Sequence, residues 1–171
     1  INWNFFRTMK RIHHSSQGIS LIEVLIGAAI VATAIVATVL SFQLLLAAGA
    51  ENLERIEASY MAEEGLEVMR GVRDADWDIF AALSTVTTYY LDYDGMNWSV
   101  TSTATTTDRF TRTILVGDVY RRTSDSDIVP ATSTVSKAID LDTRAVTVRV
   151  EWNSSRFGLR TVELTSYLTN L

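Results

Sequence analysis

The stretch Ile19-Ser-Leu-Ile-Glu-Val-Leu-Ile-Gly-Ala-Ala-Ile-Val31 opens an apolar run of about 28 residues. Glu23 is the only charged residue between Arg11 and Glu51. A helix of this length would measure roughly 42 Å, whereas about 20 residues suffice to cross a bilayer. We therefore predict a membrane-spanning helix over residues 19–46.

Glu23 stands five residues into this run. Placing a carboxylate near the centre of a membrane helix costs about 2.5–3.5 kcal/mol, and ionisable residues in such segments are candidates for function. The plain alternative is a glutamate whose side chain reaches the water interface from an ordinary anchor.

Two other interpretations of the apolar run remain. It could be the core helix of a soluble protein, or the hydrophobic region of a secretory signal peptide cleaved near Ala48-Gly49-Ala50. The run is longer than the hydrophobic region of about 7–15 residues that signal peptides use, and it contains a carboxylate. A membrane segment is therefore the preferred interpretation.

The charges are distributed unevenly around the run. Residues 1–18 carry Arg7, Lys10 and Arg11 and no acidic residue, and removing these three charges from the net charge of −5 would leave −8. Positive residues favour the cytoplasmic side, so we expect a single pass through the cytoplasmic membrane, with the N-terminus on the cytoplasmic side and everything after Leu46 outside. An acidic exported part does not favour nucleic-acid binding, and we predict none.

A helical pattern continues beyond the membrane, over residues 47–76. Leu53, Ile56 and Tyr60 recur at helical spacing, and a neighbouring stripe follows at Ala58, Ala62, Leu66, Met69 and Val72. Joined to the membrane segment, this pattern predicts one helix of about 55 residues.

Three residue features of the predicted helix over residues 47–76 bear on its packing. Glu51 and Arg55 are spaced as a favourable i,i+4 ion pair. Gly65 and Gly71 each weaken a helix by about 1 kcal/mol relative to alanine. We therefore expect tertiary packing to hold the helix there.

After Trp77 the apolar period becomes two, which predicts an antiparallel β domain over residues 77–171. The expected strands are 97–103, 111–122, 145–152 and 159–168, the last two joined by a turn at 153–158. Residues 101–107 and 123–137 are expected to be loops. One face of the sheet needs a helix to cover it, so the predicted class is α+β, a long N-terminal helix packed on a small antiparallel sheet.

The N-terminal region resembles the type IV prepilin processing motif. The resemblance is carried by a short basic leader ending in Gly18, by the following Ile19–Ile26 segment with Glu23 at its fifth position, and by the long apolar helix. It covers residues 1 to about 45 closely. A looser likeness to minor pilins and pseudopilins extends to Ala62–Arg70 and to the terminal hairpin at 146–168.

The resemblance implies processing and assembly. A prepilin peptidase would cleave between Gly18 and Ile19 and N-methylate Ile19, leaving 1–18 as a leader peptide. Glycine at the cleavage site allows an enzyme to approach the backbone closely. The carboxylate of Glu23 would then pair with the terminal ammonium of a neighbouring subunit. The implied partners are other pilin subunits, the peptidase, and an inner-membrane assembly platform with its ATPase.

Small residues recur four apart along the apolar helix. Ala28 and Ala32, and Thr33 and Ala37, form such pairs, which let helices approach closely in lipid or in a bundle. The alternative is a generic alanine-rich anchor. The helix has no proline, unlike that of many major pilins.

Three acidic pairs, each with its members two residues apart, are candidate metal ligands. Asp92-Tyr-Asp94-Gly95 begins like a calcium loop but has no bidentate glutamate, so a turn between strands is the preferred interpretation. Asp125 with Asp127 and Asp140 with Asp142 are expected in solvated loops. No metal site or other cofactor is assigned; calcium, which some pseudopilins bind, is the one that stays open.

No catalytic group is predicted. The chain has no cysteine, and its two histidines, His13 and His14, lie in the leader. Trp77, Trp98 and Trp152 are expected in the core or on a sheet face. The preferred function is a minor pilin or pseudopilin of a type IV pilus or type II secretion-like filament, with no enzymatic activity. The rival is a single-span membrane-anchored or secreted binding module outside any filament.

Overall fold

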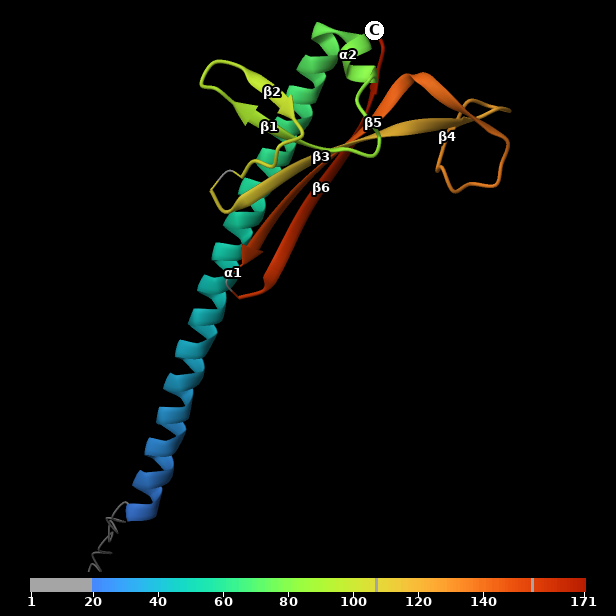
Figure 1. Cartoon of the computed structure of the whole chain (residues 1–171). Helices are drawn as coiled ribbons and strands as arrows, with labels where there is room; N and C mark the ends of the chain where they lie inside the picture. The colour runs from blue at the N-terminus through green and yellow to red at the C-terminus, as the bar shows by residue number, and fades with distance from the viewer. Residues whose placement is uncertain (1–19, 107, 155) are drawn as a thin grey trace, which may run out of the picture. The chain divides into compact units, whose positions relative to one another are not determined.

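The computed structural model describes residues 20–106, 108–154 and 156–171. They belong to two compact units, the first ending at Leu45 and the second comprising Leu46–Leu171. Figure 1 shows the course of the chain through both.

Helix α1 comprises Leu21–Ala75, 55 residues, as the sequence predicted. It begins where the carbonyl of Ser20 accepts hydrogen bonds from the backbone N–H groups of Glu23 and Val24, at 2.9 and 3.2 Å. It ends before Asp76, whose side chain accepts a hydrogen bond from the N–H of Ile79 and so caps the short helix α2, Trp77–Ala81. Helix α2 was not predicted from the sequence.

The second unit contains an antiparallel sheet in the order β2-β1-β3-β5-β6, with β4 paired to β3 beside it (Figure 1). The strands are β1 Thr88–Tyr93, β2 Trp98–Thr101, β3 Phe110–Arg122, β4 Ile128–Val129, β5 Lys137–Ser154 and β6 Gly158–Thr169. The α+β class with a long helix on a small antiparallel sheet is therefore confirmed.

The predicted hairpin of β5 and β6 is present, and Val150 lies opposite Val162 in its register. Gly158 adopts a φ of 71° where the turn enters β6, a conformation that glycine takes without steric cost. The strand β5 is longer than expected, because it starts at Lys137 and not at Ala145.

The extra length of β5 corrects the expectation of a solvated loop at Asp140 and Asp142. Both lie in β5, and Asp140 pairs with Arg121 of β3 at 2.6 Å. The register shifts here, since Asp118 pairs with Arg144 while the next residue, Val119, pairs with Asp140. The acidic residues near this shift interrupt the apolar alternation, which is why the sequence pattern missed the first part of the strand.

The core lies between the second half of α1 and one face of the sheet. The helix contributes Ala58, Ala62, Leu66 and Met69, and the sheet contributes among others Ile114, Val116, Val146, Val148, Val150 and Trp152. The predicted second stripe is thus the buried one. Trp77 and Trp98 pack against this core, as expected of them.

Gly65 lies where the helix approaches the sheet closely. A Cβ atom at this position would lie 2.8 Å from Cγ1 of Val148 and 3.3 Å from Cδ of Arg112. At Gly71 nothing would lie within 4 Å of an added Cβ. Packing therefore requires glycine at the first position and not at the second.

Arg112 is a buried cation, 5% exposed, under the same part of the helix. It donates hydrogen bonds to the carbonyl of Met61 at 3.1 Å and to Oε2 of Glu64 at 2.6 Å, and its guanidinium lies 5.0 Å from the ring centroid of Trp98. A buried charge is tolerated when paired and hydrogen-bonded in this way. These contacts tie β2 and β3 to α1.

We predict opposite effects of alanine at the two glycines. Gly65→Ala should lower the free energy of unfolding by up to about 2 kcal/mol, since an overpacking cost of about 1–3 kcal/mol against Val148 outweighs a gain of about 1 kcal/mol in helix propensity. Gly71→Ala should raise it by about 0.5–1 kcal/mol. Urea unfolding of the full chain in detergent, followed by near-UV circular dichroism, measures both. Equal stabilisation by the two substitutions would contradict the close approach.

We also predict a pH-dependent effect at Asp140. Hydrogen bonds from the side chains of Arg121 and Thr143 lower the pKa of this carboxyl. A carboxyl whose pKa is lowered by folding stabilises the folded state at pH values above the ordinary aspartate pKa of about 3.9. This stabilisation is lost as the pH falls through the folded-state pKa. Asp140→Asn should therefore cost about 1 kcal/mol at neutral pH and nothing in strong acid. Asp142→Asn is the control. A loss of stability in Asp140→Asn that is the same at neutral and at acidic pH would refute the stabilising role of the Asp140 carboxylate.

Candidate functional site

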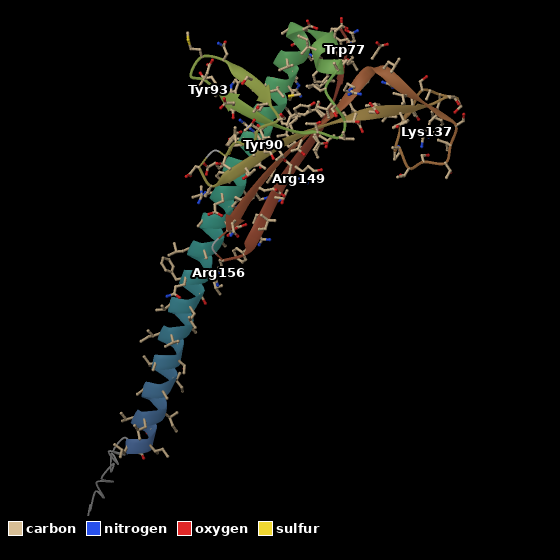
Figure 2. The ribbon with its side chains drawn as sticks, in the orientation of Figure 1. Trp77, Tyr90, Tyr93, Lys137, Arg149 and Arg156 are labelled. Atoms are coloured by element: carbon tan, nitrogen blue, oxygen red, sulfur yellow. The ribbon has the colours of Figure 1, made fainter. Side chains whose placement is uncertain are left out.

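The candidate site is the apolar helix segment, residues 21–45 of α1, which makes up the described helical part of the first unit. All its side chains are exposed, and every large apolar one is at least 51% exposed. Figure 2 shows side chains projecting from all around this half of the helix. Covering each leucine or isoleucine gains about 1.5–3 kcal/mol, so the segment requires an apolar environment.

A membrane meets that requirement in length and composition. Helix α1 contains an 18-residue window with a mean hydropathy of 2.5, none of it buried. In the described part of the chain, α1 alone is long and apolar enough to cross a bilayer.

The hydroxyl groups of the segment do not oppose burial in lipid. Thr33 donates to the carbonyls of Ala29 and Ile30, at 3.0 and 2.9 Å. Thr38 and Ser41 each donate to the carbonyl four residues earlier, both at 2.8 Å. Because the hydroxyls are satisfied within the helix, they need no water.

Small residues indent one face of the segment. Ala32, Thr33 and Ala37, with Val36 and Leu40, line a surface hollow of about 350 Å³. The helix thus brings three of the four predicted packing residues together. Ala28, the fourth, is exposed one turn before Ala32 and does not line the hollow.

Glu23 lies exposed in the first turn of α1. A carboxylate there interacts favourably with the positive end of the helix dipole. The predicted cleavage residues, Gly18 and Ile19, lie outside the described residues.

The helix presents a second apolar surface in the other unit. Leu53, Ile56 and Tyr60 are 69%, 52% and 68% exposed, and with Glu57, Met61 and Glu64 they line a shallow hollow of about 580 Å³. The sheet covers the neighbouring stripe and leaves this one free. Both stripes have helical spacing in the sequence, so spacing alone did not distinguish them.

Two glutamates of α1 bind the sheet. Glu54 accepts hydrogen bonds from Nε1 of Trp152 at 3.0 Å and from Arg109 at 2.9 Å. Glu51 accepts one from Oγ of Ser154 at 2.7 Å and pairs with Nε of Arg160 at 3.0 Å. The prediction that Glu51 pairs with Arg55 is therefore wrong, because the sheet supplies the cation.

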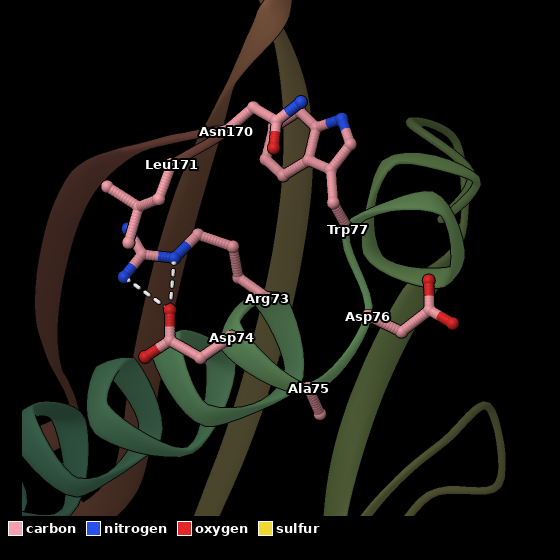
Figure 3. Close-up of a pocket in the computed structure, with 7 residues that line it drawn as sticks. All are labelled: Arg73, Asp74, Ala75, Asp76, Trp77, Asn170 and Leu171. Atoms are coloured by element: carbon pink, nitrogen blue, oxygen red, sulfur yellow. Dashed lines mark hydrogen bonds and ion pairs between the residues drawn. The ribbon is translucent and has the colours of Figure 1, made fainter.

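A pocket of about 310 Å³ lies where α1 gives way to α2, next to the end of the chain (Figure 3). Arg73 and Asp74 line it, and their side chains bind each other at 2.7–2.8 Å. The other lining residues are Ala75, Asp76, Trp77, Asn170 and Leu171. The charges of Arg73 and Asp74 neutralise one another, and the carboxylate of Asp76 accepts the capping hydrogen bond from Ile79, so all three side chains are engaged in local structure.

The acidic pairs are engaged in local structure. Oδ1 of Asp94 accepts hydrogen bonds from the N–H groups of Met96 and Asn97, both at 2.8 Å, in the turn between β1 and β2. These bonds lower the pKa of the Asp94 carboxyl, and the predicted turn is confirmed. Asp125 pairs with Arg122 at 2.6 Å. Among the described residues, no three acidic or histidine side chains come together as a metal site would need.

The architecture of the described chain is pilin-like: a long N-terminal apolar helix packed through its second half on an antiparallel sheet. No protein-family model matches this sequence, and neither the curated proteins nor the solved structures contain a match.

Proposed function

We propose that this chain is a structural subunit, a minor pilin or pseudopilin, of a type IV pilus or type II secretion-like filament. The observation that carries the proposal is the apolar helix segment, exposed on all sides and preceded by the Gly18-Ile19 motif. A membrane covers such a helix before assembly, and neighbouring subunits cover it afterwards. The pilin-like α+β architecture supports this function.

Processing would prepare the subunit for assembly. A prepilin peptidase would remove residues 1–18 on the cytoplasmic side and methylate the amino group of Ile19. The subunit would remain anchored with its new N-terminus at the inner face of the cytoplasmic membrane, as the positive leader favours. An assembly platform driven by an ATPase would then move it into an extracellular or periplasmic filament.

Glu23 would set the register between subunits. Two unit charges about 4 Å apart gain about 4 kcal/mol at an effective dielectric constant near 20. This gain is comparable to the cost of about 2.5–3.5 kcal/mol for holding the carboxylate in lipid. Pairing with the Ile19 ammonium of a neighbour therefore favours leaving the bilayer for the filament.

The helix surfaces suit a bundle. The indentation at Ala32, Thr33 and Ala37 allows another helix to approach closely, and Ala28 extends the row of small residues by one turn. The exposed Leu53, Ile56 and Tyr60 offer further apolar area beyond the membrane. Both surfaces would be buried between subunits.

Processing can be tested at Gly18. We expect Gly18→Leu to abolish cleavage, because the added side chain blocks the approach of the peptidase to the backbone. Mass spectrometry of the N-terminus, on protein from native membranes, measures the result. Gly27→Ala is the control, since an added Cβ there meets nothing within 4 Å. Normal maturation of Gly18→Leu, or a natural start at Glu51, would favour the anchored or secreted binding module.

Assembly can be tested at Glu23. We expect Glu23→Ala to be cleaved normally but to fall about tenfold or more in the sheared surface fraction, since it loses most of the pairing energy. Thr38→Val is the matched control, because it alters a polar group of the segment whose only role in the described structure is a bond to Ala34. Undiminished assembly of Glu23→Ala would eliminate the pairing mechanism.

A further inference from the structure

We propose that the tip of the β5–β6 hairpin binds phospholipid headgroups at the outer face of the membrane that holds the subunit before assembly. The hairpin tip is defined as Arg156, Phe157, Leu159 and Arg160. The inference rests on the proposed membrane-inserted state and adds a second point of contact with the same bilayer.

The hairpin tip combines exposed apolar and cationic groups. Phe157 is 44% and Leu159 69% exposed. The guanidinium groups of Arg160 and Arg156 lie 5.0 and 5.9 Å from the ring centroid of Phe157. An aromatic ring between two cations, next to a protruding leucine, suits the boundary between headgroups and acyl chains.

The contacts of α1 place this tip close to the membrane boundary. Glu51 binds Ser154 just before the turn and Arg160 just after it. Glu51 is five residues beyond Leu46, the last residue of the apolar run, a rise of roughly 7.5 Å along a helix. The headgroup layer of a bilayer is about 5–7 Å thick on each side. With the end of the apolar run at the outer boundary of the hydrocarbon core, the contacts of Glu51 with both sides of the turn bring the tip within reach of the headgroups.

The chemistry of the tip matches phosphate esters. A guanidinium group donates two parallel hydrogen bonds to a phosphate and is more weakly hydrated than an ammonium group. Arg160 lies 3.0 Å from Glu51, which orients it, and its side chain stays 42% exposed. Arg156, which is labelled in Figure 2, lies over the ring of Phe157 and adds a charge that attracts anionic lipid.

The absence of cysteine from the chain allows a direct test with single spin labels. Leu159→Cys, Val36→Cys and Met96→Cys would each carry a nitroxide in the full chain, reconstituted into vesicles of phosphatidylcholine and phosphatidylglycerol. The accessibility of the label to oxygen relative to a water-soluble nickel chelate reports its depth. Val36 tests the apolar helix segment, and Met96, 85% exposed in the β1–β2 turn, is the reference in water.

We expect the label at Leu159 to be protected from the nickel chelate relative to the label at Met96, with the label at Val36 deepest. In the Leu159→Cys background, Arg156→Gln should lower the ratio of lipid-bound to free hairpin tips by roughly fivefold. Arg149→Gln, which removes a charge from the body of β5 where it pairs with Glu163, should leave the depth at Leu159 unchanged.

The outcomes separate this inference from the proposed function. If the label at Leu159 is as accessible to the nickel chelate as the label at Met96, while the label at Val36 is protected, the headgroup contact is refuted and the membrane anchor stands. A label at Val36 in water overturns both. If the label at Leu159 is protected but also shows dipolar broadening, and if the protection disappears on dilution with lipid, the tip contacts a second copy of the chain. This result would also overturn the proposal.

Discussion

Nothing in the described part of the chain covers the apolar side chains of the α1 segment before Leu46. Its leucines, isoleucines and valines are exposed around the full circumference, and its hydroxyls are already bonded to the helix backbone. Only lipid or other helices can cover such a surface. This need for an apolar environment is the reason for the roles that we propose for the segment, for Glu23 and for the small residues.

The two halves of α1 carry different surface patterns, which suit different environments. In the apolar helix segment, apolar residues occupy all sides, whereas beyond Glu51 a stripe of small and medium residues faces the sheet and glutamates flank it. Glu51, Glu54 and Glu64 reach across to Arg160, Trp152 and Arg112. These charged contacts border the area where alanine and glycine allow the closest packing, so they help to fix the position of the helix on the sheet.

The proposed assembly and the proposed headgroup contact use different parts of the molecule at different stages. Glu23 and the small residues would act within the membrane and the filament core, whereas Arg156 and Phe157 would act at the bilayer surface before extraction. Electrostatic and apolar contacts at a headgroup layer are individually weak, which suits a contact that must be released when the subunit enters a filament.

The sequence by itself determined the length of α1, the presence of a membrane-type segment and the terminal hairpin. These follow from local periodicity, because an uninterrupted apolar run and an alternation of period two each specify one backbone geometry. The processing motif at Gly18 and the role of Glu23 rest on sequence alone, and they stay predictions.

Only the tertiary structure decided which helical stripe is buried, why Gly65 is needed and which cation pairs with Glu51. It also revealed α2, β1, β4 and the first part of β5. Each of these depends on partners distant in the sequence: Val148 for Gly65, Arg160 for Glu51, and Arg121 for Asp140. Local patterns carry no information about such partners, because contact energies between distant segments exist only once the chain has folded.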